Sequence, residues 1–485
     1  MEWALSLLGG ISVAALVLIA QWLIRILMIP VVIQRHTPAV ATSWLAILFF
    51  EPFIGLFVYL LLGRQLVGRK RIQHHTEIAR MVESRIRERT QHRNRLSLSD
   101  LPPHRRDLAR LAQTLSGMPA VEGNCVELIS STDELIDRLV KDINEAEHHV
   151  HLLFYIFESD ATGRRVAEAM ARAAERGVVC RLLLDSQGSA RALRELAGPL
   201  RAAGVHVAEA LHAGLLRQRV ARIDVRNHRK LVVIDGRIGY SGSQNIVDAH
   251  YGGDKVGPWR DLMMRVRGPV LTQLQGVFFE DWASETGDLL DFDDLLPELE
   301  QEGDALAIAV PSGPSLRAGA FRDISLSAIN EADERVILTT PYLVLDESSL
   351  LALRIRAKAG IRVDIVVPEK SNNPLVDAAS RSQYEDLLNA GVNIYLHHDG
   401  LLHAKSLSID GAIALIGSGN MDRRSFSVNY ELSLLMAGGS VGPDLVALQE
   451  RYMSESRLLT AEEWAQRSRV DRYLQNTAKL FGALL

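Results

Sequence analysis

The stretch HRKLVVIDGRIGYSGSQN, residues 228–245, decides how the chain folds and what chemistry it carries. It occurs a second time as HAKSLSIDGAIALIGSGN, residues 403–420. Both copies fit H-x-K-x4-D-x6-G-S-x-N, with the same spacing from the histidine to the asparagine. A single histidine on a strand is more often an ordinary core or surface residue. Repetition of the whole pattern favours a functional motif instead.

Each motif predicts a strand, a tight turn and a returning strand. Alternate side chains of a strand share a face, so the histidine and the lysine point the same way and converge on one anion. The aspartate lies about 16 Å further along a straight strand. It also begins an Asp-Gly pair, which is typical of a hairpin turn. We therefore interpret Asp235 and Asp410, the third members of the catalytic motif, as residues that anchor it.

The returning strand brings the Gly-Ser-x-Asn segment level with the histidine, where a hydroxyl and an amide can donate hydrogen bonds to phosphoryl oxygens. The candidate catalytic residues are His228, Lys230, Asp235, His403, Lys405 and Asp410, with the two aspartates as anchors. The candidate phosphate-binding residues are Ser243, Asn245, Ser418 and Asn420. A metal site is disfavoured because lysine is a cation and not a usual ligand. We expect neither a metal nor another cofactor.

Composition narrows the class of protein. The chain has 485 residues, of which 47% are hydrophobic and 23% charged, as in a globular protein that carries a membrane segment. The net charge of −5 argues against a nucleic-acid partner, which usually requires a basic surface. Two cysteines, Cys125 and Cys180, lie far apart, so we expect free thiols in a reducing compartment.

Two apolar segments precede the motifs. Residues 3–24 are uncharged and long enough to cross a bilayer as a helix, which we favour over a signal peptide. Residues 38–63 form the second segment, interrupted by Glu51-Pro52, and are either a kinked span or a re-entrant hairpin. Four basic residues follow it, Arg64, Arg69, Lys70 and Arg71. By the positive-inside bias we expect a multi-pass protein with both termini in the cytoplasm.

The rest of the chain predicts two similar halves, the first of which opens with a helical pattern over residues 127–146. Strand and helix patterns alternate in the same order before each motif, which favours two α/β halves, each a mostly parallel sheet with helices on its faces. We expect a membrane region over residues 1–63, a basic juxtamembrane linker over 64–118, and halves over 119–295 and 296–485. The loop 212–222 before the first motif mixes leucines with arginines and is either a membrane-surface segment or an ordinary amphipathic helix.

The duplicated motif resembles that of the phospholipase D superfamily, in which two such motifs form one active site between the halves. Other stretches look most like the bacterial cardiolipin synthases, and the likeness spans essentially the whole chain. They are residues 155–157, 256–261, 311–314, 340–342, 423–426 and 429–431. The resemblance also implies an acidic residue after each histidine that orients the histidine of the other half. Asp261 and Glu431 match these places, so we expect Asp261 to orient His403 and Glu431 to orient His228.

The resemblance implies transfer of a phosphatidyl group from one phosphatidylglycerol to another, giving cardiolipin and glycerol through a phosphohistidine. We expect His228 to be the nucleophile and His403 the acid and base. The expected partners are phosphatidylglycerol and the lipid of the bacterial inner membrane, with the catalytic region in the cytoplasm. Three alternatives are a hydrolytic phospholipase, a nuclease and an inactive scaffold. The acceptor preference and the oligomeric state do not follow from the sequence.

Overall fold

The computed structural model describes residues 12–36, 38–63, 67–90, 103–212, 224–251, 256–291, 295, 297 and 300–481. Contacts divide the chain into two units. The smaller one comprises residues 1–68 and 214–224, and the larger one residues 69–213 and 225–485. The loop expected over residues 212–222 lies almost wholly outside the described residues.

The described residues of the smaller unit form three apolar helices, α2 (Val13–Ile33), α3 (Pro38–Phe50) and α4 (Pro52–Leu62). Among the described residues, α2 is the one helix that is long and apolar enough to cross a membrane, with 21 residues and a hydropathy of 2.4. Helices α3 and α4 are shorter, at 13 and 11 residues. The structure therefore does not support the expected multi-pass arrangement.

The second apolar segment is a helical hairpin. The helical path is interrupted at Glu51. Pro52 begins α4 at a position where the missing N–H of proline costs no helical hydrogen bond. The ring of Tyr59 in α4 packs edge-on against Trp44 in α3, with centroids 5.2 Å apart. A side chain on Gly55 would lie 2.9 Å from the Cα of Leu48, so glycine permits this close approach. Of the two alternatives, the hairpin matches the structure.

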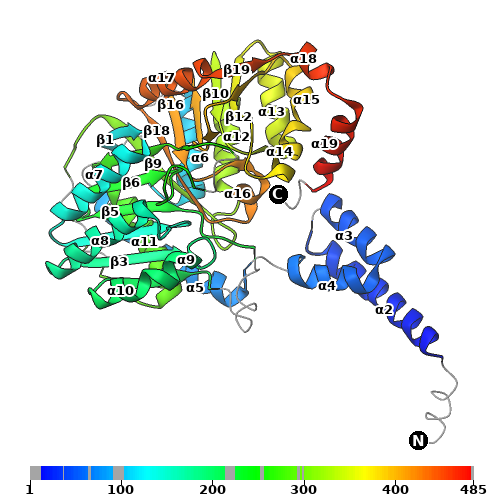
Figure 1. The fold of residues 1–485 in the computed structure, drawn as a ribbon, viewed down its shortest axis with the longest axis horizontal. Coiled ribbons are helices and arrows are strands. Elements are labelled where there is room, and N and C mark those ends of the chain that lie inside the picture. The colour runs from blue at the N-terminus through cyan, green and yellow to red at the C-terminus, as the bar shows by residue number, and fades with distance from the viewer. Residues whose placement is uncertain are drawn as a thin grey trace, which may run out of the picture. The chain divides into compact units, whose positions relative to one another are not determined.

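The described residues of the larger unit form one continuous sheet of fifteen strands. In spatial order these are β19 (Ser456–Leu459), β13 (Asn393–His397), β12 (Arg362–Pro368), β10 (Arg335–Thr339), β15 (Ser406–Ile409), β16 (Ile413–Gly417), β18 (Glu431–Ala437), β9 (Ala305–Ser312), β1 (Val121–Ile129), β8 (Met263–Arg267), β6 (Ile238–Gly242), β5 (Lys230–Ile234), β2 (His149–Phe154), β3 (Val179–Asp185) and β4 (His206–Ala210). Apart from β19, the order runs through equivalent strands outward from β1 and β9. The two halves are thus structural repeats, coloured cyan to green and lime to red in Figure 1.

Helices accompany these strands. They are α5 (Arg69–Thr90), α6 (Pro103–Ser116), α7 (Thr132–Glu145), α8 (Ala161–Glu175), α9 (Ala190–Glu195), α10 (Ala197–Ala202), α11 (Leu271–Thr286), α12 (Ala320–Asn330), α13 (Glu347–Lys358), α14 (Pro374–Arg381), α15 (Tyr384–Leu388), α16 (Arg423–Ser427), α17 (Val441–Ser454), α18 (Ala461–Ala465) and α19 (Arg469–Phe481). Helix α11 is buried along its length from Leu271 to Ala283 and packs against α5, β5 and β9. It therefore belongs to the core of the unit.

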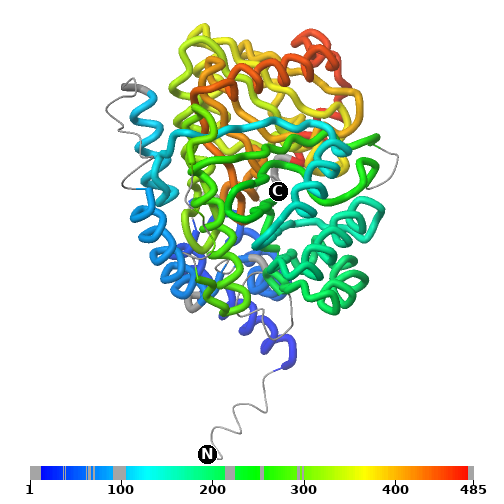
Figure 2. The backbone as a smooth tube through the Cα atoms, turned by 90° about the vertical axis from the view of Figure 1, so that its left-hand side faces the viewer, coloured from blue at the N-terminus to red at the C-terminus, as the bar shows by residue number. Residues whose placement is uncertain are grey.

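The halves meet at β1 and β9, which pair antiparallel. Figure 2 shows the cyan segment of β1 crossing the molecule between the green first half and the yellow and orange second half. Two short parallel pairings cross the same junction. Strand β14 (Leu401–Leu402) pairs with β7 (Trp259–Arg260), and an isolated bridge joins Asn227 to Tyr430. Each pairing places the residue before a motif histidine beside the residue before a predicted acid.

The sheet differs from the mostly parallel one that was predicted. Parallel pairing holds within β2-β3-β4 and within β10-β12-β13, whereas the motif hairpins and the strands beyond them pair antiparallel. The reason is local, because a tight Asp-Gly turn can join only antiparallel strands. The sheet is therefore mixed.

Two further segments depart from the expectation. Residues 127–146, predicted as helix, continue strand β1 to Ile129 before Ser131 caps α7, accepting from the Glu134 N–H at 3.4 Å. Part of the expected linker is also packed structure, because α5 lies against α11 and carries Arg71, which pairs with Glu285. Both departures depend on contacts with distant segments.

Asp235 and Asp410 end the first strands of the two motif hairpins. Each has a positive φ of 52° and accepts three backbone N–H groups from the segment that leads into β2 or β10. The distances are 2.7–2.8 Å from Glu147, His148 and His149 to Asp235, and 2.7–2.9 Å from Asp333, Glu334 and Arg335 to Asp410. Each carboxylate therefore links the end of one strand to the start of the strand that pairs with it.

We expect Asp235→Ala to destabilise the larger unit by about 2–4 kcal/mol, because three N–H groups lose a charged acceptor at once. A lower midpoint of thermal unfolding, followed by circular dichroism, measures the effect. Asp137→Ala is the matched control, since Asp137 is exposed and pairs only at the surface with Arg165. Equal midpoints in the two variants would contradict the anchoring role.

Candidate active site

One cavity of about 410 Å³ exposes both motif histidines. Its walls come from both halves and include Tyr155, Asn245, Trp259, Tyr342 and Asn420. The two junction pairings position both histidines at the cavity. The His228 N–H donates to the Tyr430 carbonyl at 2.9 Å, and the His403 N–H donates to the Arg260 carbonyl at 2.7 Å. Each histidine is thereby held to the half that does not contain its own motif.

Each imidazole contacts a carboxylate of the other half. His228 Nδ1 lies 2.9 Å from Glu431 Oε2, and His403 Nδ1 lies 2.7 Å from Asp261 Oδ1. Burial would raise the pKa of each acid. Histidine and lysine neighbours lower the pKa of both Asp261 and Glu431 below its ordinary value. The carboxylates are therefore ionised at neutral pH.

An ionised carboxylate only accepts hydrogen bonds, so the Nδ1 atom of each histidine carries the proton that it donates. Burial lowers the pKa of His228 and of His403 to about 4, although Glu431 and Asp261 oppose the shift. Both rings are then neutral at pH 7. In this tautomer each Nε2 holds a lone pair, which is the form needed by a nucleophile or a base.

The motif lysines are buried and bind the backbone of the histidines. Lys230 Nζ donates to the His228 carbonyl at 2.7 Å, and Lys405 Nζ donates to the His403 carbonyl at 2.5 Å. Burial lowers the pKa of Lys230 to about 7 and that of Lys405 to about 8, while the ionised Glu431 and Asp261 oppose the shifts. An anion bound in the cavity would favour the charged form of both lysines.

The lysine pKa values predict the alkaline limb of the pH profile. As pH rises through about 7 to 8, Lys230 and then Lys405 lose the charge that attracts an anionic substrate. We therefore expect kcat/KM, which reports the free enzyme, to fall over this range. In Lys230→Arg the limb should move to higher pH, because arginine stays protonated. An unmoved limb would assign the transition to another group.

The motif serines differ from their expected role. Ser243 Oγ donates to Asp261 Oδ1 and Ser418 Oγ donates to Glu431 Oε2, both at 2.6 Å, and both side chains are fully buried. Each hydroxyl also accepts the backbone N–H that follows its acid, at 2.9 Å. The serines thus hold the carboxylates that orient the histidines, and a direct bond to phosphate is not what this geometry favours.

Of the remaining motif residues, the asparagines line the cavity and the aspartates stabilise the fold. Asn245 and Asn420 line the cavity, and Asn245 Oδ1 accepts the Ile156 N–H at 3.2 Å, which orients its amide. Asp235 and Asp410 are not among the residues that line the cavity and instead anchor the hairpins. The structure therefore brings the histidines, asparagines and predicted acids together and separates the motif aspartates from them.

Aromatic rings pack on both histidines. The Tyr155 ring lies 4.8 Å from the His228 ring, with Lys230 Nζ 5.4 Å from its centroid, and the Trp259 ring lies 4.5 Å from the His403 ring. These contacts limit rotation of the imidazoles. The sequence offered Tyr155 and Trp259 only as parts of stretches that match a family and gave no signal of this packing.

Arg229, between the first motif's histidine and lysine, is fully buried and ties the two halves together. Its guanidinium donates to both oxygens of Asp281 at 2.7 and 2.8 Å, and its Nε donates to the Glu431 carbonyl at 3.1 Å. The corresponding residue of the second motif is Ala404. This asymmetry is visible in the sequence, but its structural role is not.

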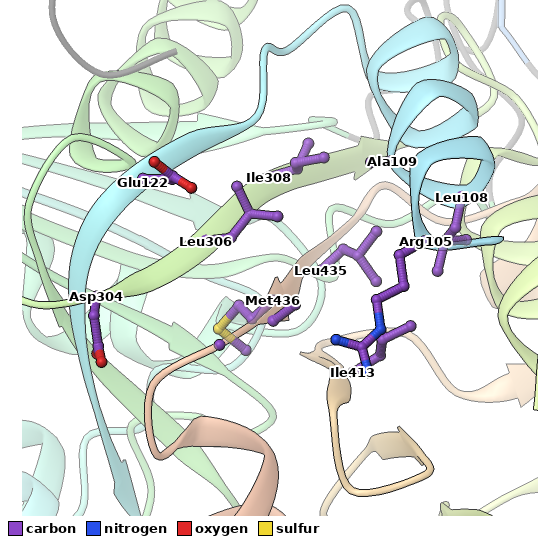
Figure 3. A pocket seen from close by; sticks show the side chains of 12 residues that line it. Arg105, Leu108, Ala109, Glu122, Asp304, Leu306, Ile308, Ile413, Leu435 and Met436 are labelled. Carbon is purple, nitrogen blue, oxygen red and sulfur yellow. The ribbon is translucent and has the colours of Figure 1, made fainter. Parts of the chain in front are cut away.

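A second cavity, of about 190 Å³, lies between α6 and the sheet (Figure 3). Leu306 and Ile308 of β9, Leu435 of β18 and Ile413 of β16 line it, with Arg105 and Leu108 from α6. Its lining contains neither a histidine nor a lysine. This second cavity therefore lacks the side chains that carry the chemistry of the motifs.

A pair of carboxylate-oriented imidazoles and two buried ammonium groups on a duplicated sheet define a phospholipase D-like protein that acts on phosphate esters. A family model for the phospholipase D-like domain of cardiolipin synthase matches residues 139–257 and 326–454. Cardiolipin synthase A of Erwinia tasmaniensis is 37% identical over 476 residues, 96% of each chain, and that of Serratia proteamaculans is 36% identical over 474 residues, also 96% of each. The chain belongs to the cardiolipin synthase family of phospholipase D-like enzymes.

Similarity to solved structures supports the fold. The crystal structure of phosphatidylserine synthase from Haemophilus influenzae Rd KW20 matches with a TM-score of 0.57 and 13% identity. The match covers 78% of this chain and 97% of that one. At this identity the likeness concerns the arrangement of strands and helices alone.

Proposed function

We propose that the protein makes cardiolipin by transferring a phosphatidyl group from one phosphatidylglycerol to another. The observation that carries the proposal is the single cavity into which both halves present a neutral imidazole, each hydrogen-bonded to an ionised carboxylate of the other half. Two such groups suit a reaction in which one attacks phosphorus and the other moves protons. Membership of the family agrees with this chemistry.

In the first step, Nε2 of His228 attacks the phosphorus of phosphatidylglycerol and the bond to the glycerol oxygen breaks. The bound phosphodiester anion favours the charged form of the neighbouring His403, which in this complex is protonated at Nε2. His403 gives that proton to the departing oxygen, so free glycerol leaves and a phosphatidyl group remains on His228. Lys230 and Lys405 offset the negative charge of the phosphoryl oxygens. Asn245 and Asn420, which line the cavity, are placed to donate amide hydrogen bonds to the same oxygens.

In the second step, His403 takes the proton from the terminal hydroxyl of a second phosphatidylglycerol. That oxygen attacks the phosphorus, the bond from phosphorus to His228 breaks, and cardiolipin leaves. His403 ends protonated, as it began. One phosphodiester replaces another, so the reaction needs no nucleotide and no oxidant.

Incubation of the purified protein with phosphatidylglycerol as the sole lipid tests the proposal. We expect cardiolipin and glycerol in equal amounts. Phosphatidic acid in place of cardiolipin would identify a hydrolase, because water would then be the acceptor. Mass spectrometry of the lipids and an enzymatic glycerol assay distinguish the outcomes.

We further propose that the larger unit faces the cytoplasm at the inner membrane. The basic residues that follow the second apolar segment support this side. With α2 as a span and α3 and α4 as a hairpin that returns to its own side, the N-terminus would lie on the opposite face. This departs from the expectation that both termini are cytoplasmic.

Cysteines introduced as Glu2→Cys and Glu300→Cys, each in a Cys125→Ala, Cys180→Ala background, test this topology. In intact cells a membrane-impermeant thiol reagent should label position 2 and leave position 300 unlabelled until lysis. Labelling of position 300 without lysis would place the larger unit outside. Protection of both positions would restore the arrangement with two spans.

A further inference from the structure

Two positively charged side chains in the cavity have no part in the reaction steps described above. Arg226 and Arg424 line it together with His228 and His403. Among the described lining residues, Asp422 is the one carboxylate. Burial raises the pKa of Asp422 to about 6, and the nearby Glu431 adds to the shift. The lining therefore carries a net positive charge before the two motif lysines are considered.

Both arginines lie on the side of His228. The Tyr430 N–H donates to the Arg226 carbonyl at 2.9 Å, next to the bridge that places His228. Arg424 lies in α16, and its carbonyl accepts the Asn429 N–H at 2.8 Å just before Tyr430. Burial raises the pKa of the Tyr155 hydroxyl, and both Arg226 and Arg424 oppose that rise. The two guanidinium groups therefore influence the pKa of Tyr155, whose ring packs on His228.

Neighbouring side chains hold both guanidinium groups. Arg226 donates to Gln187 Oε1 and to the Val225 carbonyl, the latter at 2.6 Å. Arg424 donates to Asn429 Oδ1 at 3.5 Å. A guanidinium has five N–H donors in a planar fork, a geometry that matches a bidentate contact with a phosphate. The arrangement suits an anionic ligand in the cavity.

The positive charge of Arg226 has no counterpart in the second half, unlike the histidine and lysine of the motif. Two residues before the motif histidine stands Arg226 in the first half, but Leu401, a buried residue of β14, in the second half. Histidine, lysine, asparagine and an orienting acid occur in both halves. A feature present on one side suits a ligand that binds on one side.

The two lipids of the proposed reaction differ in this way. Each carries one phosphodiester anion, and only the donor's phosphorus lies between the two histidines. The acceptor brings a second anion, separated from the reacting phosphorus by one glycerol unit. A second anion in a buried cavity is unfavourable unless it is paired. The duplicated lysines serve the first phosphate, so the second requires another cationic site.

We propose that Arg226 and Arg424 form an acceptor subsite that binds the phosphodiester anion of the second phospholipid. This inference rests on the proposed function and deepens it. The subsite favours an anionic phospholipid as acceptor over water or a neutral alcohol, because only the phospholipid supplies a charge for the arginines. It holds the acceptor's terminal hydroxyl near the phosphatidyl group on His228.

Competition between two acceptors in one reaction tests the subsite. Phosphatidylglycerol is supplied as donor and anionic acceptor together with 1-butanol as a neutral acceptor, and the ratio of cardiolipin to phosphatidylbutanol is measured. Arg424→Gln and Arg226→Gln should each lower this ratio at least about tenfold, the loss expected for one charge-assisted hydrogen bond. Arg424→Lys, which keeps the charge, should recover part of it. The ratio does not depend on how much enzyme is folded.

Arg423→Gln is the matched control, since Arg423 precedes Arg424 in α16 but does not line the cavity. Its ratio should equal that of the wild type. Inorganic phosphate should lower the ratio in the wild-type enzyme, because it competes at the acceptor subsite; competition at the donor site would reduce both products equally. This measurement decides the matter if a glutamine variant yields neither product.

The outcomes separate this inference from the proposed function. A wild-type enzyme that makes phosphatidylbutanol but no cardiolipin overturns the proposed function and the subsite with it. A wild-type enzyme that makes cardiolipin, with the same product ratio in both glutamine variants and with phosphate present, overturns the subsite alone. A lowered ratio in both variants and not in Arg423→Gln supports it.

Discussion

His228→Ala and His403→Ala should each reduce cardiolipin formation by at least about 10³-fold, because each removes half of a single reaction centre. The two rings line one cavity, and each is oriented from the opposite half. Neither half therefore contains both a nucleophile and a proton carrier. Initial rates of cardiolipin formation from phosphatidylglycerol measure the loss.

His206→Ala is the matched control, since His206 is exposed on β4. Its rate should equal that of the wild type. Near-normal activity in either cavity variant would mean that the halves hold independent sites. The two variants also test the assignment of roles with acyl-labelled phosphatidyl-p-nitrophenol, whose leaving group needs no proton, because labelled phosphate should accumulate on His228 in His403→Ala. Label on His403 in His228→Ala would reverse that assignment.

The motif hairpins could be predicted because their signals are local. Strand alternation places His228 and Lys230 on one face, and the Asp-Gly pair defines the turn. The two copies have equal spacing, and the structure shows equivalent strands β5-β6 and β15-β16. The three backbone hydrogen bonds to each aspartate agree with its interpretation as an anchor.

Contacts between distant segments could not be predicted in this way. The end of strand β1, residues 127–129, falls within the predicted helix over 127–146, because the strands that pair with β1 lie far along the chain. The pairing of Asp261 with His403 was expected from a family resemblance, whereas the backbone bridge that produces it was not. The role of Ser243 could not be predicted either, because its hydroxyl donates to Asp261, a carboxylate from another segment of the chain.

Glu431→Gln should lower cardiolipin formation by about 10² to 10⁴-fold while leaving the fold intact. Glu431 is fully buried and receives four hydrogen bonds, from His228 Nδ1, Ser418 Oγ, Ser425 Oγ and Asn429 Nδ2, at 2.6–3.3 Å. A glutamine amide keeps the shape but loses the charge, and its NH₂ group cannot accept from any of these donors. His228 then loses the partner that holds its proton on Nδ1, and fewer molecules present a lone pair on Nε2.

Asp261→Asn should impair cardiolipin formation to a similar extent, but at a different step, and a substrate with a better leaving group separates the two variants. Phosphatidyl-p-nitrophenol releases p-nitrophenolate without needing a proton, so its first step requires the nucleophile His228 and not the acid His403. Release of p-nitrophenolate should therefore stay low in Glu431→Gln and approach the wild-type burst in Asp261→Asn. Glu462→Gln, at an exposed position of α18, controls for loss of one carboxylate. The opposite pattern, with the burst kept in Glu431→Gln and lost in Asp261→Asn, would make His403 the nucleophile, because each acid acts through the histidine that it orients.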